Sequence, residues 1–276
     1  MAVARPSLDE ELLHELLGRL DQLEADGVLT PVITLDRLRE FLSGGQCVLV
    51  EQVIGLRPGD YGVSTPYAGD LEPVPPDLVR VSGQQYYEHG ERRTLGDKYV
   101  PRHVFTWYSA LNKAFADEHP GRRLLIESCY RSPAYQVAVF VSWLVTRYQG
   151  DIRQTIRHAS PPAYSQHTIA SKAAIDFKNV DGAPSAIDPA DFARTAEYAW
   201  LRKHADRFRF HESWRPDNEF GMRAEPWHWQ YRPPKGETGH SGRPKGLTAG
   251  QASGRPVPSP RGRRASAGSP TCPRRS

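Results

Sequence analysis

The apolar positions of the first 30 residues repeat with a helical period. Leucines recur at spacings of three and four, which predicts an amphipathic helix; they are Leu12, Leu13, Leu16, Leu17, Leu20 and Leu23. Ser7 and Glu10 match a capping box that would begin this helix, and Gly27 would end it. We expect the helix to pack on a core, with binding to a partner or to a second copy as the alternative.

The pattern up to residue 96 is less regular. A second short helix is expected over residues 35–42, ended by two glycines. The apolar run CVLVEQVI, residues 47–54, predicts a strand. Residues 57–81 are rich in Pro, Gly and Asp and are expected to be mostly loop. Residues 1–96 show no chemical motif, so they could form a small separate domain or an N-terminal extension.

From residue 97 onward, helical and strand patterns alternate. Helices are expected over residues 101–118, 134–148, 152–158 and 188–204. Strands are expected over residues 122–128, 173–177, 208–210 and 226–231. This order predicts an α+β domain over residues 97–235. Residues 236–276 are mostly Gly, Pro, Ser, Ala and Arg, which predicts a disordered tail because such a segment buries little apolar surface.

Composition fits a globular protein and limits its class. Of the 276 residues, 38% are hydrophobic, and no apolar run reaches the roughly 18 residues of a membrane span. The N-terminus turns acidic where a signal peptide would be apolar, so no export signal is expected in the chain as given. Cys47, Cys129 and Cys272 are widely separated, which excludes a disulfide framework and a cysteine-rich zinc finger.

The formal charge of +4 comes from the tail. From Gly236 onward there are seven Arg and one Lys against one Glu, a net charge of +7, which leaves −3 for the residues before it. The body therefore does not favour a nucleic-acid-binding protein. The tail is expected to be a solvated end, with binding to nucleic acid or anionic wall polymers as the alternative.

Candidate chemistry is concentrated in the segment AYSQHTIASKAAIDF, residues 163–177. It holds His167 near its start and Asp176 near its end, where the pattern predicts a strand. Alternation along that strand would bury Ile175 and Phe177 and turn Asp176 to the opposite face. An imidazole and a carboxylate are two of the three protein ligands of a common hydrolytic zinc site.

The aromatic strand PWHWQY supplies a candidate third ligand. Alternation would place its three aromatic side chains on one face and His228 on the other. Two imidazoles and one carboxylate would leave a fourth coordination position for water, which the metal would activate. A regular strand would put Glu225 opposite His228, but a bend at Pro226 could bring the Glu225 carboxylate to the same pocket as a proton acceptor and donor.

Arg131 lies at a predicted turn between a strand and a helix. There its guanidinium could bind a carboxylate or a developing oxyanion. Each of these residues also has an ordinary structural alternative: a hydrogen-bonded histidine, a turn-capping aspartate, a surface glutamate or an arginine in a salt bridge. Only their combination indicates a site.

Three blocks in order, YRSPAYQ, SQH…AIDF and EPWHWQY, resemble the VanY-type zinc D-alanyl-D-alanine carboxypeptidases and their VanX dipeptidase relatives over residues 98–231. The resemblance implies a small antiparallel sheet flanked by helices, with Zn2+ as cofactor. It also implies the site residues, which are the metal ligands His167, Asp176 and His228, the catalytic base and acid Glu225, the transition-state stabiliser Arg131, and the substrate-binding residues Ser165, Gln136 and Tyr130.

One departure from the family pattern concerns the loop between two of the ligands. Six residues commonly separate the His and the Asp, with a glycine among them, whereas eight separate His167 from Asp176 here. This lengthening implies an altered loop geometry. His158 and Asp151 are the alternative ligands if the insertion displaces His167.

The implied activity is hydrolysis next to a D-amino acid in peptidoglycan stem peptides or D-Ala-D-Ala peptides. The alternatives are a lysin-like endopeptidase of the same fold and a non-catalytic cell-wall binder. The chain lacks the S-x-x-K motif of serine peptidases and a complete HExxH motif. The place of action stays open, since a misassigned start, another export route or cytoplasmic action are all compatible with the sequence. The oligomeric state is open as well.

Overall fold

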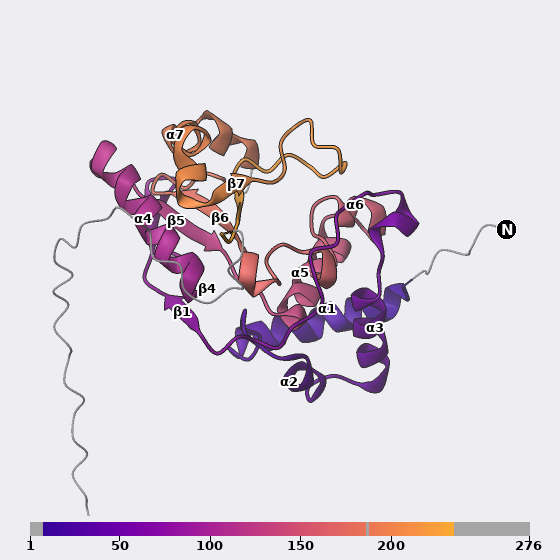
Figure 1. The fold of residues 1–276 in the computed structure, drawn as a ribbon. Helices are drawn as coiled ribbons and strands as arrows, with labels where there is room; N and C mark the ends of the chain where they lie inside the picture. The colour runs from indigo at the N-terminus through magenta and orange to yellow at the C-terminus, as the bar shows by residue number, and fades with distance from the viewer. Residues whose placement is uncertain (1–7, 186–187, 235–276) are drawn as a thin grey trace, which may run out of the picture. The chain divides into compact units, whose positions relative to one another are not determined.

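The structure is a computed structural model that describes residues 8–185 and 188–234. All of them belong to one compact unit of the chain. The predicted tail, residues 236–276, lies outside the described residues. Helices and small antiparallel sheets are mixed along the chain, which confirms the predicted α+β class (Figure 1). Among the described residues, no helix has the length and apolar character needed to cross a membrane.

The predicted N-terminal helix is present as α1, Glu10–Ala25. Its buried residues are Leu13, Leu16, Leu20 and Leu23, which confirms the amphipathic pattern. The helix begins later than expected, because the Asp9 side chain accepts the cap bond from the Leu12 amide at 2.9 Å. Ser7 lies outside the described residues. Gly27, with φ +69°, follows the end of the helix, where the left-handed conformation favours glycine.

The predicted strand over residues 47–54 is wrong, since this run belongs to helix α3, Gly44–Ile54. A capping box begins the helix: Ser43 Oγ accepts from the Gln46 amide, and Gln46 Oε1 accepts from the Ser43 amide. The run buries Leu49, Val50 and Val53, whose spacing is helical. Helix α2, Leu35–Arg39, precedes it and is shorter than expected.

A first core joins these N-terminal helices to helices from later in the chain. Helix α1 packs against α3 and against α5, Pro133–Thr146. Helix α6, Ile152–Ile156, and the short 3₁₀ helix η1, Pro58–Tyr61, contribute to the same cluster. Residues 8–63 and α5 therefore bury their apolar faces against each other.

Residues 78–101 form two small antiparallel ladders that the sequence pattern did not predict. Strand β1, Leu78–Val81, pairs with β4, Lys98–Pro101. Strand β2, Gln85–Glu88, forms a hairpin with β3, Glu91–Thr94. Residues 57–81, expected to be mostly loop, are loop apart from η1 and β1.

The main sheet has four antiparallel strands in the order β5-β6-β8-β7. Their bounds are Leu124–Ser128 for β5, Ala174–Asn179 for β6, His228–Tyr231 for β8 and Phe210–Glu212 for β7. Every residue of β6 is buried. A β-bulge between Ile126 and Ser128 aligns Ser128 with Asp176, and Asp176 in turn pairs with His228. One row of residues thus runs across three strands.

The two faces of this sheet differ as the alternation predicts. Ile175, Phe177, Trp229 and Tyr231 belong to a second core, which α4, Arg102–Glu118, and α7, Ala196–His204, complete. On the other face, Asp176, Lys178 and His228 line a cavity. The predicted helix over residues 188–204 is divided into the 3₁₀ helix η4, Pro189–Arg194, and α7, because the Thr195 side chain caps a new helix.

Candidate metal centre

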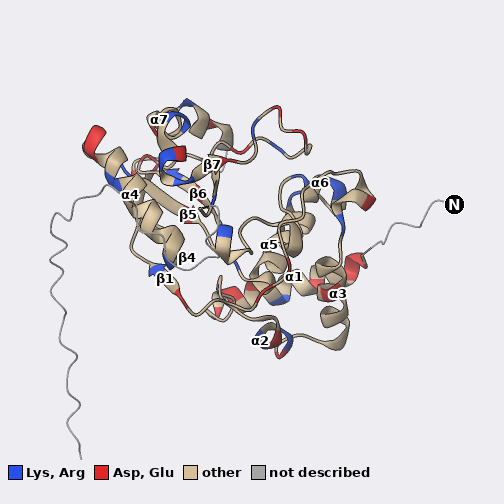
Figure 2. Cartoon of the chain, viewed as in Figure 1, with Lys and Arg blue, Asp and Glu red and all other residues tan. Residues whose placement is uncertain are grey.

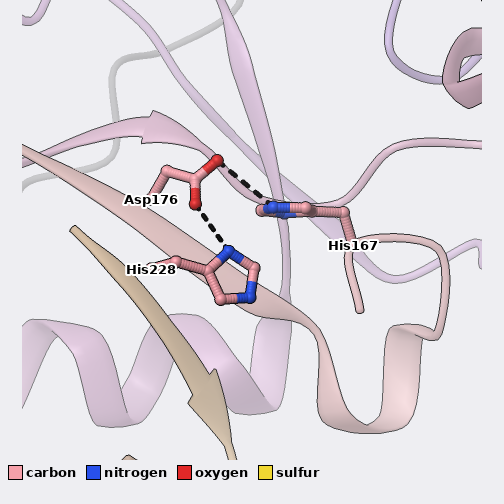
Figure 3. A group of neighbouring side chains, drawn as sticks. All are labelled: His167, Asp176 and His228. Atoms are coloured by element: carbon pink, nitrogen blue, oxygen red, sulfur yellow. Dashed lines mark hydrogen bonds and ion pairs between the residues drawn. The ribbon is translucent and has the colours of Figure 1, made fainter. Parts of the chain in front are cut away.

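A loop and two paired strands bring His167, Asp176 and His228 together (Figure 3). Asp176 lies on β6, and His228 is its neighbour in register on β8. His167 lies in the loop between two 3₁₀ helices, η2, Pro162–Tyr164, and η3, Ala170–Lys172. All three side chains are buried, and one ligand atom from each lies within 4.8 Å of the others.

The spacing of these atoms fits a small metal ion. Asp176 Oδ1 lies 2.8 Å from His228 Nδ1, and Asp176 Oδ2 lies 3.2 Å from His167 Nε2 (Figure 3). Ligands about 2.0–2.1 Å from a tetrahedral zinc ion lie roughly 3.3 Å from each other. The two Asp176 pairs are close to this separation, and the three ligand atoms all lie within 4.8 Å of one another. Two imidazoles with one carboxylate are a donor set that suits zinc.

The ionisation of two of the candidate ligands also fits metal binding. Burial, aided by Arg131, lowers the pKa of His167 to about 4. Burial alone would raise the pKa of Asp176, but the two histidines hold it well below its ordinary value. A neutral imidazole and a charged carboxylate are the forms that coordinate a metal, so little proton release is needed at these two side chains.

The lengthened loop is held by hydrogen bonds at both ends. The Gln166 carbonyl accepts from the Ala174 amide at 3.1 Å, which closes the loop onto the start of β6. The His167 carbonyl accepts from the Arg131 amide at 3.1 Å. The Thr168 hydroxyl donates to two carbonyls of the preceding turn, those of Pro162 and Ser165. The eight residues between His167 and Asp176 therefore do not separate the two side chains.

Glu225 reaches the cluster through a turn. The His228 amide donates to the Glu225 carbonyl at 3.0 Å, and β8 begins only at His228, so the two side chains are not on opposite faces of one strand. Glu225 Oε2 lies 3.8 Å from His228 Nδ1. Burial and the nearby charge of Asp176 raise the pKa of Glu225 well above its ordinary value.

Arg131 is fixed beside the same carboxylate. Its guanidinium donates to Ser128 Oγ at 2.7 Å, to Gln136 Oε1 at 3.2 Å and to Asp176 Oδ2 at 3.0 Å. The Gln136 amide nitrogen donates to the Ser160 carbonyl at 2.9 Å. Both polar groups of Gln136 are thus engaged within the protein, and one of them orients Arg131.

A cavity of about 460 Å³ opens onto the cluster. Most of the predicted site residues line it: His167, Asp176, His228, Glu225, Arg131, Gln136 and Ser165. Tyr130 is not part of its lining. The Tyr130 side chain is buried, and its amide donates to the Tyr99 carbonyl at 3.0 Å.

The two alternative ligands do not join the cluster. His158 lines the cavity, but its Nδ1 is hydrogen-bonded to the Tyr148 hydroxyl and its ring lies against Trp143. Asp151 caps α6 by accepting from the Gln154 amide at 2.9 Å. Each has an ordinary structural role.

Sequence reasoning missed two groups that touch the histidines. The Cys129 carbonyl lies 2.8 Å from His167 Nδ1, and Gln166 Oε1 lies 2.9 Å from His228 Nε2. A main-chain oxygen and a common polar side chain carry no recognisable signal in a single sequence. Only the fold shows where they lie.

The α+β fold and the buried His-Asp-His cluster define a candidate metallohydrolase centre. Residues 97–234, half of the chain, match the model of the VanY family, described as D-alanyl-D-alanine carboxypeptidase. The chain belongs to this family of peptidoglycan-acting carboxypeptidases. This confirms the resemblance drawn from the three sequence blocks. No curated protein matches the chain in sequence.

Several solved structures match part of the chain. The LdcB LD-carboxypeptidase is 21% identical, and the match covers 63% of this chain and 77% of that chain with a TM-score of 0.45. A mutant of the vancomycin resistance D,D-pentapeptidase VanY, solved with Zn(II), is 19% identical over 61% and 87% of the two chains, with a TM-score of 0.39. VanYB with D-alanine-D-alanine is 18% identical over 61% and 86%, with a TM-score of 0.40.

Proposed function

We propose that the protein is a zinc-dependent carboxypeptidase that removes the terminal D-alanine from peptidoglycan stem peptides ending in D-alanyl-D-alanine. The observation that carries this proposal is the buried His167, Asp176 and His228 cluster, which shares one cavity with Glu225 and Arg131. Membership of the VanY family supports the same activity.

In this proposal the three clustered residues hold the zinc ion. When bound, zinc lowers the pKa of a water molecule and polarises the scissile carbonyl. The two oxygens of Asp176 lie 2.8 Å and 3.2 Å from the two imidazole nitrogens that would bind the ion with it. The burial of all three side chains keeps bulk water from competing at the site.

Glu225 is the proton carrier. Its carboxylate takes a proton from the attacking water, whose oxygen forms a bond to the carbonyl carbon. As the C–N bond breaks, the same carboxyl passes the proton to the leaving amino group. A pKa raised by burial and by Asp176 suits a group that must both accept and donate a proton near neutral pH.

Arg131 stabilises the negative charge that develops on the carbonyl oxygen. Because Ser128, Gln136 and Asp176 already hold its guanidinium, little reorganisation is needed as that charge forms. Ser165 lines the cavity, and in this proposal it contacts the peptide. Gln136 acts through Arg131, to which its amide oxygen is bonded.

Product analysis on a defined stem pentapeptide ending in D-Ala-D-Ala tests the proposal. We expect free D-alanine and the tetrapeptide in equal amounts. Cleavage inside the stem without release of D-alanine would indicate the endopeptidase alternative. Binding of the peptide without any product would indicate a non-catalytic cell-wall binder.

Removal of the metal is the second test. We expect about one zinc ion per chain, loss of hydrolysis with a chelator, and recovery when zinc is added back. The melting temperature should fall in the chelator, since a ligand that binds only the folded state stabilises it. Metal analysis, D-alanine release and thermal unfolding on one preparation measure all three, and hydrolysis unaffected by complete zinc removal would contradict the mechanism.

A further inference from the structure

Each imidazole of the candidate metal centre has a hydrogen-bond partner on the nitrogen that points away from Asp176. His167 Nδ1 donates to the main-chain carbonyl of Cys129, whereas His228 Nε2 is bonded to the Gln166 side chain. We propose that Gln166 is the positioning residue that fixes His228 as a metal ligand. This inference rests on the proposed zinc centre and extends it to a residue without any ligand role of its own.

The position of the proton on His228 follows from the geometry. Its Nδ1 lies 2.8 Å from Asp176 Oδ1 and 3.8 Å from Glu225 Oε2, so Nδ1 is the nitrogen that faces the ion position. A ligating nitrogen carries no proton, so the single proton of the neutral ring must lie on Nε2. There it meets Gln166 Oε1 at 2.9 Å. Without that acceptor, the tautomer with a proton on Nδ1, donated to Asp176, would compete with metal binding.

Gln166 is itself held so that its oxygen points at the histidine. The Ser213 hydroxyl donates to the same Oε1 at 2.7 Å, so this oxygen lies between two donors. The Gln166 main chain is tied to the start of β6 through the Ala174 amide. Trp214 covers one side of the His228 ring, with the ring centroids 6.0 Å apart. Gln166 therefore fixes the orientation of His228 from a rigid support.

Gln166 also links the two histidines. It immediately precedes His167, so the peptide segment that delivers one ligand orients the other through its side chain. Loss of a partner of this kind typically costs about 10–100-fold in metal affinity.

Zinc affinity of the full-length chain tests the inference, measured by competition with a chromophoric chelator. Gln166→Leu keeps the size of the side chain but removes the acceptor, and we expect zinc binding to weaken by about 10–100-fold. Gln166→Glu retains an acceptor oxygen and should stay within a few-fold of the wild type. The visible spectrum of the cobalt-substituted protein should change in Gln166→Leu and be restored in Gln166→Glu.

Gln84→Leu is the matched control. Gln84 makes two hydrogen bonds to the Ile126 main chain, at 2.8 Å and 2.9 Å, and does not line the cavity. Its loss should lower the melting temperature and leave zinc affinity unchanged. Wild-type affinity in Gln166→Leu would overturn the inference, as would a Gln166→Glu variant as weak as Gln166→Leu.

The same measurements separate this inference from the proposed function. A wild-type protein that binds no zinc would overturn both. A wild-type protein that binds zinc but releases no D-alanine would overturn the function alone, and the comparison of the two Gln166 variants would still decide the role of Gln166.

Discussion

At the scale of a single residue, one backbone turn determines where the Glu225 carboxylate lies. A continuous strand through Pro226 would have pointed the Glu225 carboxylate away from His228. The turn closed by the bond from the His228 amide to the Glu225 carbonyl places it 3.8 Å from His228 Nδ1 instead. The position of the proposed proton carrier is therefore set by the backbone path just before β8.

Glu225→Gln tests this role with almost no change in shape. The amide cannot take a proton from water, so we expect kcat to fall by about 10²–10⁴-fold. Zinc content should stay near one per chain. Glu219→Gln, at an exposed carboxylate, is the control and should retain the wild-type rate. A Glu225→Gln enzyme with wild-type kcat would show that another group carries the proton.

His158 gives a pH dependence of stability. Burial, with Arg223 and Arg147 nearby, lowers the pKa of His158 to about 4 from its ordinary value of 6.5. Between these values the unfolded chain binds the proton and the folded chain does not. The free energy of unfolding is therefore unaffected by the titration of His158 above about pH 6.5, and it decreases as the pH falls from 6.5 towards 4.

The variant His158→Gln should weaken that dependence. We expect its free energy of unfolding to fall less between pH 7.5 and pH 5.0 than that of the wild type. Urea unfolding at both pH values, with chelator present throughout, measures the difference. If the free energy of unfolding fell equally in the two proteins, His158 would not contribute to the pH dependence of stability.

At the scale of elements, the sequence predicted those with strong periodicity and missed those without it. The leucines of α1 and the alternation in β6 and β8 were sufficient. The apolar run in α3 satisfies a strand and a helix equally well, and the capping box of Ser43 and Gln46 was the signal that decides between them. The hairpin of β2 and β3 was missed because β3 is exposed at every position, so no apolar alternation marks it.

Of the candidate site, the residues whose roles the recognisable sequence blocks imply were predicted, and the hydrogen-bond partners of the two histidines were not. The recognised blocks supplied the candidate ligands, Glu225 and Arg131, because their residue types and order are specific, and the structure brings these residues to one cavity. Gln166 and His228 are 62 positions apart, so no local pattern could connect them. Tyr130, a substrate-binding residue by the family resemblance, is buried and does not line the cavity.

Gly182 lies where the main chain after β6 closely approaches the β2-β3 hairpin. Its φ is +91°, and a Cβ atom there would lie 2.5 Å from the Tyr87 carbonyl oxygen. The adjacent contact, from the Tyr87 amide to the Val180 carbonyl at 2.8 Å, anchors β2 beside the cavity residue Tyr86. This close approach of two backbones requires glycine.

We expect Gly182→Ala to lower the free energy of unfolding by more than about 2 kcal/mol, from the positive φ and the clash together. Gly83→Ala is the control, because Gly83 has φ +69° but open space around a Cβ atom. Gly83→Ala should lower the free energy of unfolding by only about 1 kcal/mol. Urea unfolding compares the two, and equal losses would show that the contact with Tyr87 relaxes freely.

At the scale of the molecule, the N-terminal region and the family-matched region share a core. Leu16, Leu20 and Val53 lie in the same buried cluster as Val137 and Phe140 of α5. The match to the family begins only at residue 97, yet α5 buries its apolar face largely on residues before that point. Acidic and basic residues are interspersed over the described ribbon (Figure 2).

A chain that starts at residue 97 should therefore not fold normally. The apolar face of α5 would be exposed, so we expect aggregation and loss of cooperative unfolding. Solubility, near-UV circular dichroism and zinc binding of residues 97–234 measure this against the full chain. A soluble fragment with a cooperative transition and wild-type zinc affinity would show that residues 1–96 are dispensable.

The two histidines differ in how easily a mutation can remove their hydrogen-bond acceptors. The acceptor for His167 is the main-chain carbonyl of Cys129. A carbonyl oxygen is present whichever side chain residue 129 carries, so no single codon change can delete that acceptor. The acceptor for His228 is a side chain and can be lost in one step. Of these two hydrogen bonds, only the one to residue 166 can therefore be lost by a single substitution of the accepting residue.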